Sequence, residues 1–132
     1  MQGKQNKFWP SWVPAAGILM VLAASLVVGC ADGSGEALLE AGITRLIKGD
    51  YRAAARKLEK AVEKLPQSAS AWCNLGVARL KLGQTEQASE SFKKASELEP
   101  NDPIPLEFLG QALIQLKNFD DARNALAKAG EL

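Results

Sequence analysis

Residues 69–102 read ASAWCNLGVARLKLGQTEQASESFKKASELEPND, and this stretch decides the fold of the chain. Apolar residues recur three and four positions apart in its first half (Ala71, Trp72, Leu75, Ala78, Leu82) and again in its second half (Ala88, Phe92, Ala95, Leu98). That spacing is typical of amphipathic helices. Gly83 stands between the halves, where glycine adopts a positive φ easily, and Pro100 stops the second half. The stretch predicts helices over 69–82 and 85–98.

The same pattern recurs at a shift of 34 residues on both sides. Three small residues and one large apolar residue align in three copies (Gly42, Gly76, Gly110; Ala54, Ala88, Ala122; Leu58, Phe92, Leu126; Ala61, Ala95, Ala129). Between residues 35–66 and 69–100, ten positions are identical. The repeat predicts four more helices over 36–48, 51–64, 103–116 and 119–130. Ser68 and Asp102 are expected N-caps, Pro103 fits a first helical turn, and no strand is expected.

These residues resemble the tetratricopeptide repeat family, whose 34-residue unit is a pair of antiparallel helices. The second copy matches best, with Trp72-x2-Leu75-Gly76, Ala88-x3-Phe92-x2-Ala95 and Pro100. The departures from the family pattern are mild: Arg45 and Arg79 replace the usual tyrosine-like residue. The resemblance covers residues 35–132 and implies an all-α solenoid of three repeats and six helices, over about 35–68, 69–102 and 103–132.

The resemblance also implies a groove lined by the first helix of each repeat, which holds a protein or peptide partner. Transferred position by position, the candidate groove residues are Leu39, Ile43, Ser70, Cys73, Asn74, Val77, Lys81, Ile104, Phe108 and Gln111. One subclass of the family clamps a C-terminal carboxylate, and only Asn74 matches its clamp. The groove is mixed and fairly apolar, which favours a hydrophobic partner segment. The alternative for each apolar residue is packing between helices.

Three further features have ordinary structural explanations. Cys73 is expected to be a buried, weakly reactive thiol rather than a redox or mixed-disulfide site. Asp120 and Asp121 resemble a metal or catalytic pair, but they fall in the first turn of a predicted helix, where carboxylates meet the helix dipole favourably. Trp72 is expected to pack in the core or between repeats.

Composition excludes most enzyme classes. The 132 residues contain no histidine, which removes Ser-His-Asp and Cys-His pairs and imidazole metal sites. A net charge of +1 and only 6% aromatic residues indicate neither the excess of positive charge nor the base-stacking aromatic residues that are typical of nucleic-acid-binding proteins. Two cysteines cannot build a disulfide framework. We therefore expect no catalytic residue, no metal, no cofactor and no nucleic-acid partner.

The N-terminus has the pattern of an export signal. Lys4 and Lys7 precede a stretch without charge over residues 8–31, and its apolar part over 15–29 is about 22 Å long as a helix, short for a membrane span. Val27-Val28-Gly29-Cys30 resembles the lipobox of bacterial lipoproteins, which implies that residues 1–30 are a signal peptide and that Cys30 is lipidated. The alternatives are an ordinary cleaved signal and an uncleaved membrane span, for which Trp9 and Trp12 would supply an interfacial belt.

The predicted organisation is thus a signal or anchor over 1–30, a flexible tether over 31–35 and a repeat domain over 36–132. Ala31 follows Cys30 where aspartate would favour retention in the inner membrane, which weakly favours the outer membrane. We expect a scaffold, anchored at a bacterial envelope membrane and facing the periplasm, that binds a protein or peptide in its groove. The alternatives are the docking arm of a longer envelope protein or enzyme, and a structural spacer without a groove ligand.

The C-terminal edge is expected to lack a capping helix. The last predicted helix carries an apolar stripe of Phe119, Ala122, Ala125, Leu126 and Ala129, and the preceding one adds Leu109, Leu113 and Leu116. Solenoid repeats cover such surfaces with a neighbouring repeat or a polar cap. The sequence therefore predicts a longer product, or docking of this edge on a second copy or a partner.

Overall fold

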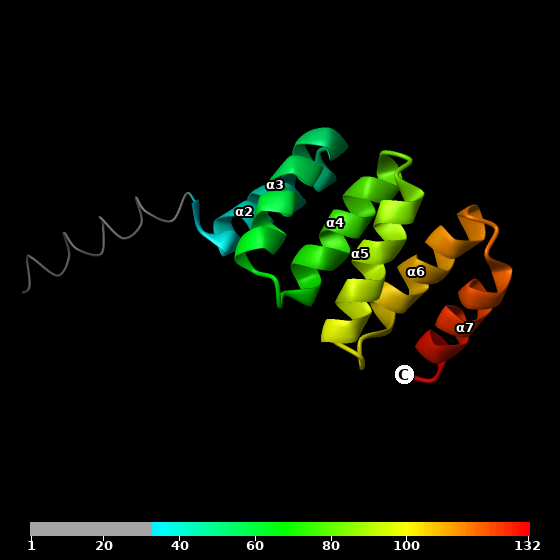
Figure 1. Ribbon diagram of the computed structural model, residues 1–132. Helices are drawn as coiled ribbons and strands as arrows, with labels where there is room; N and C mark the ends of the chain where they lie inside the picture. Colours follow the sequence, from blue (N-terminus) through cyan, green and yellow to red (C-terminus); the bar gives the residue numbers. More distant parts are fainter. Residues whose placement is uncertain (1–32) are drawn as a thin grey trace, which may run out of the picture. The chain divides into compact units, whose positions relative to one another are not determined.

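The computed structural model describes residues 33–132, which form six α-helices. Their bounds are α2 Gly35–Ile47, α3 Tyr51–Lys64, α4 Ala69–Lys81, α5 Thr85–Leu98, α6 Pro103–Gln115 and α7 Phe119–Gly130. Consecutive helices pair as α2 with α3, α4 with α5 and α6 with α7, and the pairs stack in chain order (Figure 1). Residues 33–132 contain no strand, so the all-α repeat solenoid predicted from the sequence is confirmed. Each helix lies within one residue of its expected bounds.

Hydrogen bonds with nearby side chains define where most of the helices begin. The side chains of five residues accept a backbone N–H in the first turn of the helix that follows them: Ser34, Asp50, Ser68, Asp102 and Asn118. Such caps satisfy amide groups that have no partner within a helix. The predicted caps Ser68 and Asp102 are confirmed, as is Pro103 in the first turn of α6. The expected positive φ is found at Gly83, and Gly49 has the same value of 77°.

The core consists of apolar residues that one helix pair presents to the next. One buried cluster joins the first and second repeats (Ala54, Ala55, Leu58, Val62, Ala71, Leu75, Ala78), and another joins the second and third (Ala88, Phe92, Ala112). The three aligned glycines (Gly42, Gly76 and Gly110), here called the glycine column, each face a large side chain: a Cβ on Gly76 would lie 2.6 Å from Phe92. Trp72 packs against the first cluster and donates its Nε1–H to the Pro66 carbonyl at 2.9 Å, as expected of a packing residue.

The repeat unit starts slightly earlier than expected. Ser34 caps α2, and Gly35 is buried in its first turn, where an added Cβ would lie 2.4 Å from Leu65. Lys64 donates a hydrogen bond to the Gly33 carbonyl. Ser34 and Gly35 thus form the capped and packed beginning of α2. The predicted signal, lipobox and Cys30 lie outside the described residues.

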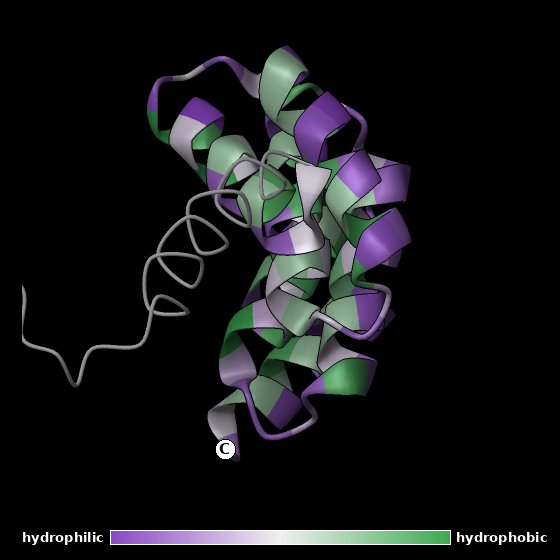
Figure 2. Cartoon of the chain, turned by 90° about the vertical axis from the view of Figure 1, so that its left-hand side faces the viewer, coloured by the Kyte–Doolittle hydropathy of each residue, from purple (hydrophilic) through white to green (hydrophobic). Residues whose placement is uncertain are grey.

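Hydrophilic and hydrophobic segments alternate along the helices (Figure 2). Among residues 33–132, none of the helices has the length and apolar character that a membrane span requires.

At the C-terminal edge, the apolar stripe expected on α7 is partly buried and partly exposed. Ala122, Ala125 and Ala129 are buried, whereas Phe119 is 63% exposed and Leu126 39% exposed. The alanines are buried because their small side chains let α7 pack closely on α6.

Candidate functional site

Six of the ten predicted groove residues line one hollow between α4 and α6. The hollow has a volume of about 370 Å³ and is lined by Ala69, Ser70, Cys73, Asn74, Val77, Glu99, Asp102, Ile104, Pro105 and Phe108. The predicted residues among them are Ser70, Cys73, Asn74, Val77, Ile104 and Phe108. Because α4 and α6 are the first helices of adjacent repeats, the hollow lies where the family resemblance places a groove.

The apolar part of the hollow is held by the core. Phe108 stacks on the fully buried Phe92, with ring centroids 5.2 Å apart and an interplanar angle of 13°. Cys73 and Val77 pack against the same cluster from α4. Ile104 differs from these residues, because 51% of its surface is exposed. The hollow thus presents one accessible large apolar side chain beside a rigid apolar floor.

The polar part of the hollow is mostly engaged within the chain. Asn74 donates its side-chain amide to the Ser70 carbonyl at 2.8 Å and to the Ser70 hydroxyl at 3.3 Å. Asp102 accepts the backbone N–H of Ile104 at 3.0 Å as the α6 cap. Glu99 and Asp102 add negative charge to the rim. A rim with two carboxylates repels a C-terminal carboxylate, in agreement with the incomplete clamp in the sequence.

Cys73 is a neutral thiol in this hollow. Burial and, secondarily, the negative charge of Asp102 together raise the pKa of Cys73 to about 11. The thiolate is the reactive form of cysteine, and it is scarce near neutral pH when the pKa is this high. Cys73 therefore acts as a small apolar wall residue, as expected from the sequence.

Four predicted groove residues lie outside the hollow. Leu39 packs against the first core cluster, and Ile43 is half-buried on α2. Lys81 and Gln111 are exposed on α4 and α6. The prediction from the sequence missed four lining residues: Ala69 at the start of α4, and Glu99, Asp102 and Pro105 from the α5–α6 connection and the start of α6. The capping pattern located Asp102, but nothing in the linear pattern placed it beside α4.

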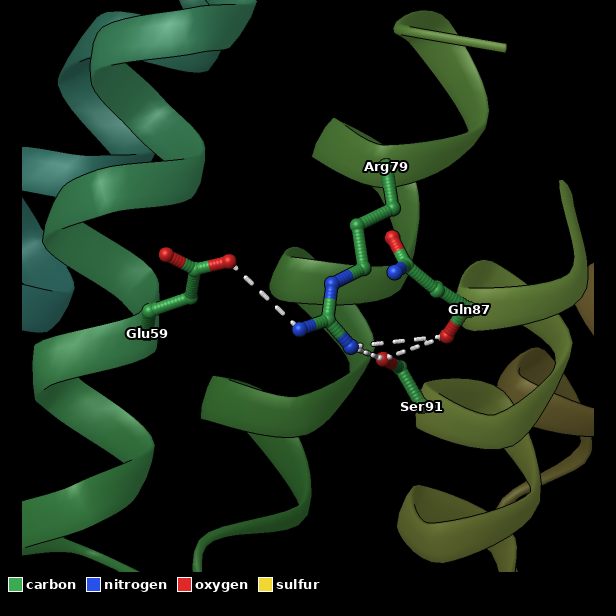
Figure 3. A network of polar contacts seen from close by, with 4 residues as sticks. All are labelled: Glu59, Arg79, Gln87 and Ser91. Carbon is green, nitrogen blue, oxygen red and sulfur yellow. Dashed lines mark hydrogen bonds and ion pairs between the residues drawn. The ribbon is translucent and has the colours of Figure 1, made fainter. Parts of the chain in front are cut away.

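A second hollow lies between α5 and α7. The equivalent space one repeat earlier, between α3 and α5, is filled by the side chain of Arg79. Between α3 and α5, Arg79 donates to the Ser91 hydroxyl at 2.9 Å and to the Gln87 carbonyl at 3.5 Å, and it pairs with Glu59 at 3.5 Å (Figure 3). Thirty-four residues later, these four positions are occupied by Lys93, Leu113, Asp121 and Ala125. They line a hollow of about 400 Å³ with Ser89, Glu90 and Leu109. Leucine is too short to bridge the helices as Arg79 does.

The acidic pair of α7 has the structural role expected from its position. Asp120 and Asp121 lie in the first turn of the helix. Asp120 pairs with Arg123 at 2.8 Å, and Asp121 accepts the Asn118 side-chain amide at 2.6 Å. Within residues 33–132, no group of three or more acidic, cysteine or histidine side chains is arranged to hold a metal ion.

Known repeat families match most of the described unit. Residues 69–102 match the model of the tetratricopeptide repeat, residues 44–83 match a TPR repeat model, and residues 106–132 match a further tetratricopeptide repeat model. No curated protein matches the chain significantly in sequence.

Solved structures share the fold. MamA from Desulfovibrio magneticus RS-1, from residue 41 to its end, is 26% identical with a TM-score of 0.74, over 82% of this chain and 61% of that one. The Yersinia enterocolitica type III secretion translocator chaperone SycD is 20% identical with a TM-score of 0.70, over 74% of each chain. A chain of the CopN–Scc3 complex is 21% identical with a TM-score of 0.69, over 72% of this chain and 56% of that one.

The chain spans about three fifths of the length of several of the MamA chains that it matches. The 34-residue period, the three stacked helix pairs and the family matches agree with one another. The part of the chain that the structure describes is a solenoid of tetratricopeptide repeats.

Proposed function

We propose that this protein is a membrane-anchored scaffold that binds an apolar segment of an envelope protein or peptide in the hollow between α4 and α6. The observation that carries the proposal is that six residues selected by the family resemblance line one hollow, with Ile104 exposed above an apolar floor. Apolar segments with few polar contacts are typical ligands of such grooves. The protein acts by binding and performs no catalytic step of its own.

The fold supports a protein as the partner. SycD is a translocator chaperone, and Scc3 forms a complex with CopN; both structures share this repeat fold. The acidic rim of the hollow, from Glu99 and Asp102, favours a segment whose flanks are neutral or basic.

A photo-crosslinking amino acid at position 104 tests groove binding in the full-length protein within its native membrane. We expect position 104 to capture a discrete partner, and the same residue at position 47 to capture none, since Ile47 is 82% exposed but does not line the hollow. The change Ile104→Asp should weaken binding at least roughly tenfold, because it places an unpaired carboxylate in an apolar contact.

The matched change Ile47→Asp should leave binding intact. Equal capture from both positions would contradict groove binding. Absence of capture from position 104 would favour the spacer interpretation. Phe108 is unsuitable for this test, because its stack on Phe92 makes it part of the core.

We also propose that the anchor is a lipid on Cys30. Each buried methylene of an acyl chain contributes about 0.8 kcal/mol, so stable attachment needs more than one chain. We expect metabolic labelling with palmitate to mark the protein, and Cys30→Ser to abolish both the label and the globomycin-sensitive processing. A full-length, unlabelled form that persists in membranes would instead support the uncleaved span, with Trp9 and Trp12 at the interface.

The C-terminal face supports a second, weaker contact, with another copy of the chain. Ile114, Phe119, Ala122, Arg123, Leu126 and Ala127 border a hollow of about 550 Å³ on α6 and α7. The equivalent face of the second repeat is covered by α6, which buries Phe92 completely. The opposite end of the unit presents Glu40 and Thr44 on α2 at the positions where α6 carries Phe108 and Ala112. Head-to-tail stacking is therefore poorly matched, and pairing of two C-terminal faces is favoured.

A further inference from the structure

The outward side of α3 carries five basic residues. They are Arg52, Arg56, Lys57, Lys60 and Lys64, and all are exposed. The opposite side of the helix is buried through Ala54, Ala55, Leu58, Ala61 and Val62. Four of the cations are spaced four residues apart, which places them in one row along the helix. We call these five residues the basic face of α3.

The charge of the basic face is largely uncompensated within the described unit. None of the five takes part in an ion pair among residues 33–132. Glu59 lies on the same helix, but it pairs with Arg79 of α4. Glu63 remains as the only other acidic residue of α3. A row of solvent-exposed cations attracts anions, and ion pairs of such exposed side chains within the protein would add little to its stability.

The repeat architecture does not require this charge. The equivalent residues of α5 are Glu86, Glu90, Ser91, Lys94 and Leu98, and those of α7 are Asp120, Asn124, Ala125, Lys128 and Leu132. Each of these rows holds one cation, and both helices fold and pack as α3 does. The basic face is thus a property of the first repeat alone, which points to a role outside the fold.

One end of the basic face lies beside Gly33, the first residue that the structure describes. Lys64, at its C-terminal end, donates a hydrogen bond to the carbonyl of Gly33. The uncharged stretch of residues 8–31 ends two residues before Gly33 in the sequence. If that stretch or its lipid holds the chain at a bilayer, the bilayer is the first extended surface within reach of α3.

We propose that the basic face of α3 binds anionic lipid headgroups of the membrane that anchors the N-terminus. This inference rests on the membrane anchor of the proposed function. A basic helix beside an anchor adds electrostatic attraction to anionic lipids, and one acyl chain with a basic patch forms a stable two-part attachment. Such contact would orient the unit, with α3 toward the bilayer.

Protection of lysines from acetylation tests the contact in the full-length protein. The chain is reconstituted into vesicles of phosphatidylcholine alone, or with roughly one third phosphatidylglycerol, and treated with a water-soluble acetylating reagent. We expect acetylation of Lys57 and Lys60 to fall roughly fivefold on the anionic vesicles, and to recover at high salt. Lys93, Lys94 and Lys128 serve as internal controls and should be labelled equally on both vesicles.

A pair of charge-reversal variants tests whether the protection depends on the basic face of α3 or only on the net charge of the protein. Arg52→Glu with Arg56→Glu should remove the protection of Lys57 and Lys60 on anionic vesicles. The matched pair Lys93→Glu with Lys94→Glu has the same net charge and should preserve it. Equal labelling on the two kinds of vesicle overturns the inference and leaves an acidic protein as the remaining partner for α3.

Flotation distinguishes failure of this inference from failure of the anchor. A chain that floats with both vesicles but shows equal labelling is anchored and lacks the lipid contact. Flotation only with anionic vesicles supports the contact and contradicts the anchor. A chain that floats with neither overturns both.

Discussion

At the scale of single residues, Lys117 is the point where the chain departs from its own repeat. It lies 34 residues after Gly83, which lies 34 after Gly49, and all three have a left-handed φ (60°, 77° and 77°). A side chain costs about 1 kcal/mol in this conformation, because the Cβ approaches the following carbonyl. We expect Lys117→Gly to raise the free energy of unfolding by about 1 kcal/mol, measured by denaturant unfolding of residues 33–132.

The reverse change supplies the control for Lys117. Gly83→Lys should lower the free energy of unfolding by a similar amount, since nothing lies within 4 Å of a Cβ at that position and only the backbone opposes it. Unchanged stability in both variants would show that the turn tolerates any residue. The repeat register places Lys117 at the turn position of Gly49 and Gly83, and the backbone angle shows that Lys117 adopts the same left-handed conformation.

At the scale of the helix pair, the glycine column sets how closely the two helices approach. A Cβ on Gly76 would lie 2.6 Å from the fully buried Phe92, whereas one on Gly110 would lie 2.6 Å from Leu126, which is 39% exposed. We expect Gly76→Ala to lower the free energy of unfolding by about 1–3 kcal/mol through overpacking.

Gly110→Ala is the matched comparison, measured by the same unfolding experiment. Leu126 can move toward solvent, so the clash is relieved and the higher helix propensity of alanine, worth about 1 kcal/mol, remains. We expect no loss of stability or a small gain. A larger loss at Gly110 than at Gly76 would contradict the explanation that the burial of Phe92 makes the added methyl group costly.

At the scale of the whole unit, the exposed apolar face of the last repeat is expected to drive weak dimerisation. Phe119 is 63% exposed and Ile114 47% exposed on this face. Sedimentation velocity of residues 33–132 should show a concentration-dependent dimer that Phe119→Ser with Ile114→Ser abolishes. Ile47→Ser, at the other end of the unit, should leave the dimer intact. A strictly monomeric unit with a protected α7 in hydrogen exchange would contradict the proposal.

Helix positions and repeat register follow from the sequence alone, because they rest on interactions within a few residues. The periodicity of Leu75, Ala78 and Phe92 determines which helix faces are buried, and Ser68 and Asp102 cap the helices through local hydrogen bonds. The family resemblance similarly located six residues of the hollow, because the repeat register fixes which positions of each first helix face the same side.

Tertiary packing decided what local pattern could not. Ile43 and Val77 occupy equivalent apolar positions one repeat apart, yet Val77 borders the hollow while Ile43 is half-buried on α2 outside it. Glu99 and Asp102 reach the hollow because the α5–α6 connection passes beside α4, a contact between segments far apart in the chain. The alanines of α7 are buried because that helix settles closely on α6, which leaves Phe119 and Leu126 exposed. Each outcome depends on the distance between helices, which only the summed packing of many side chains determines.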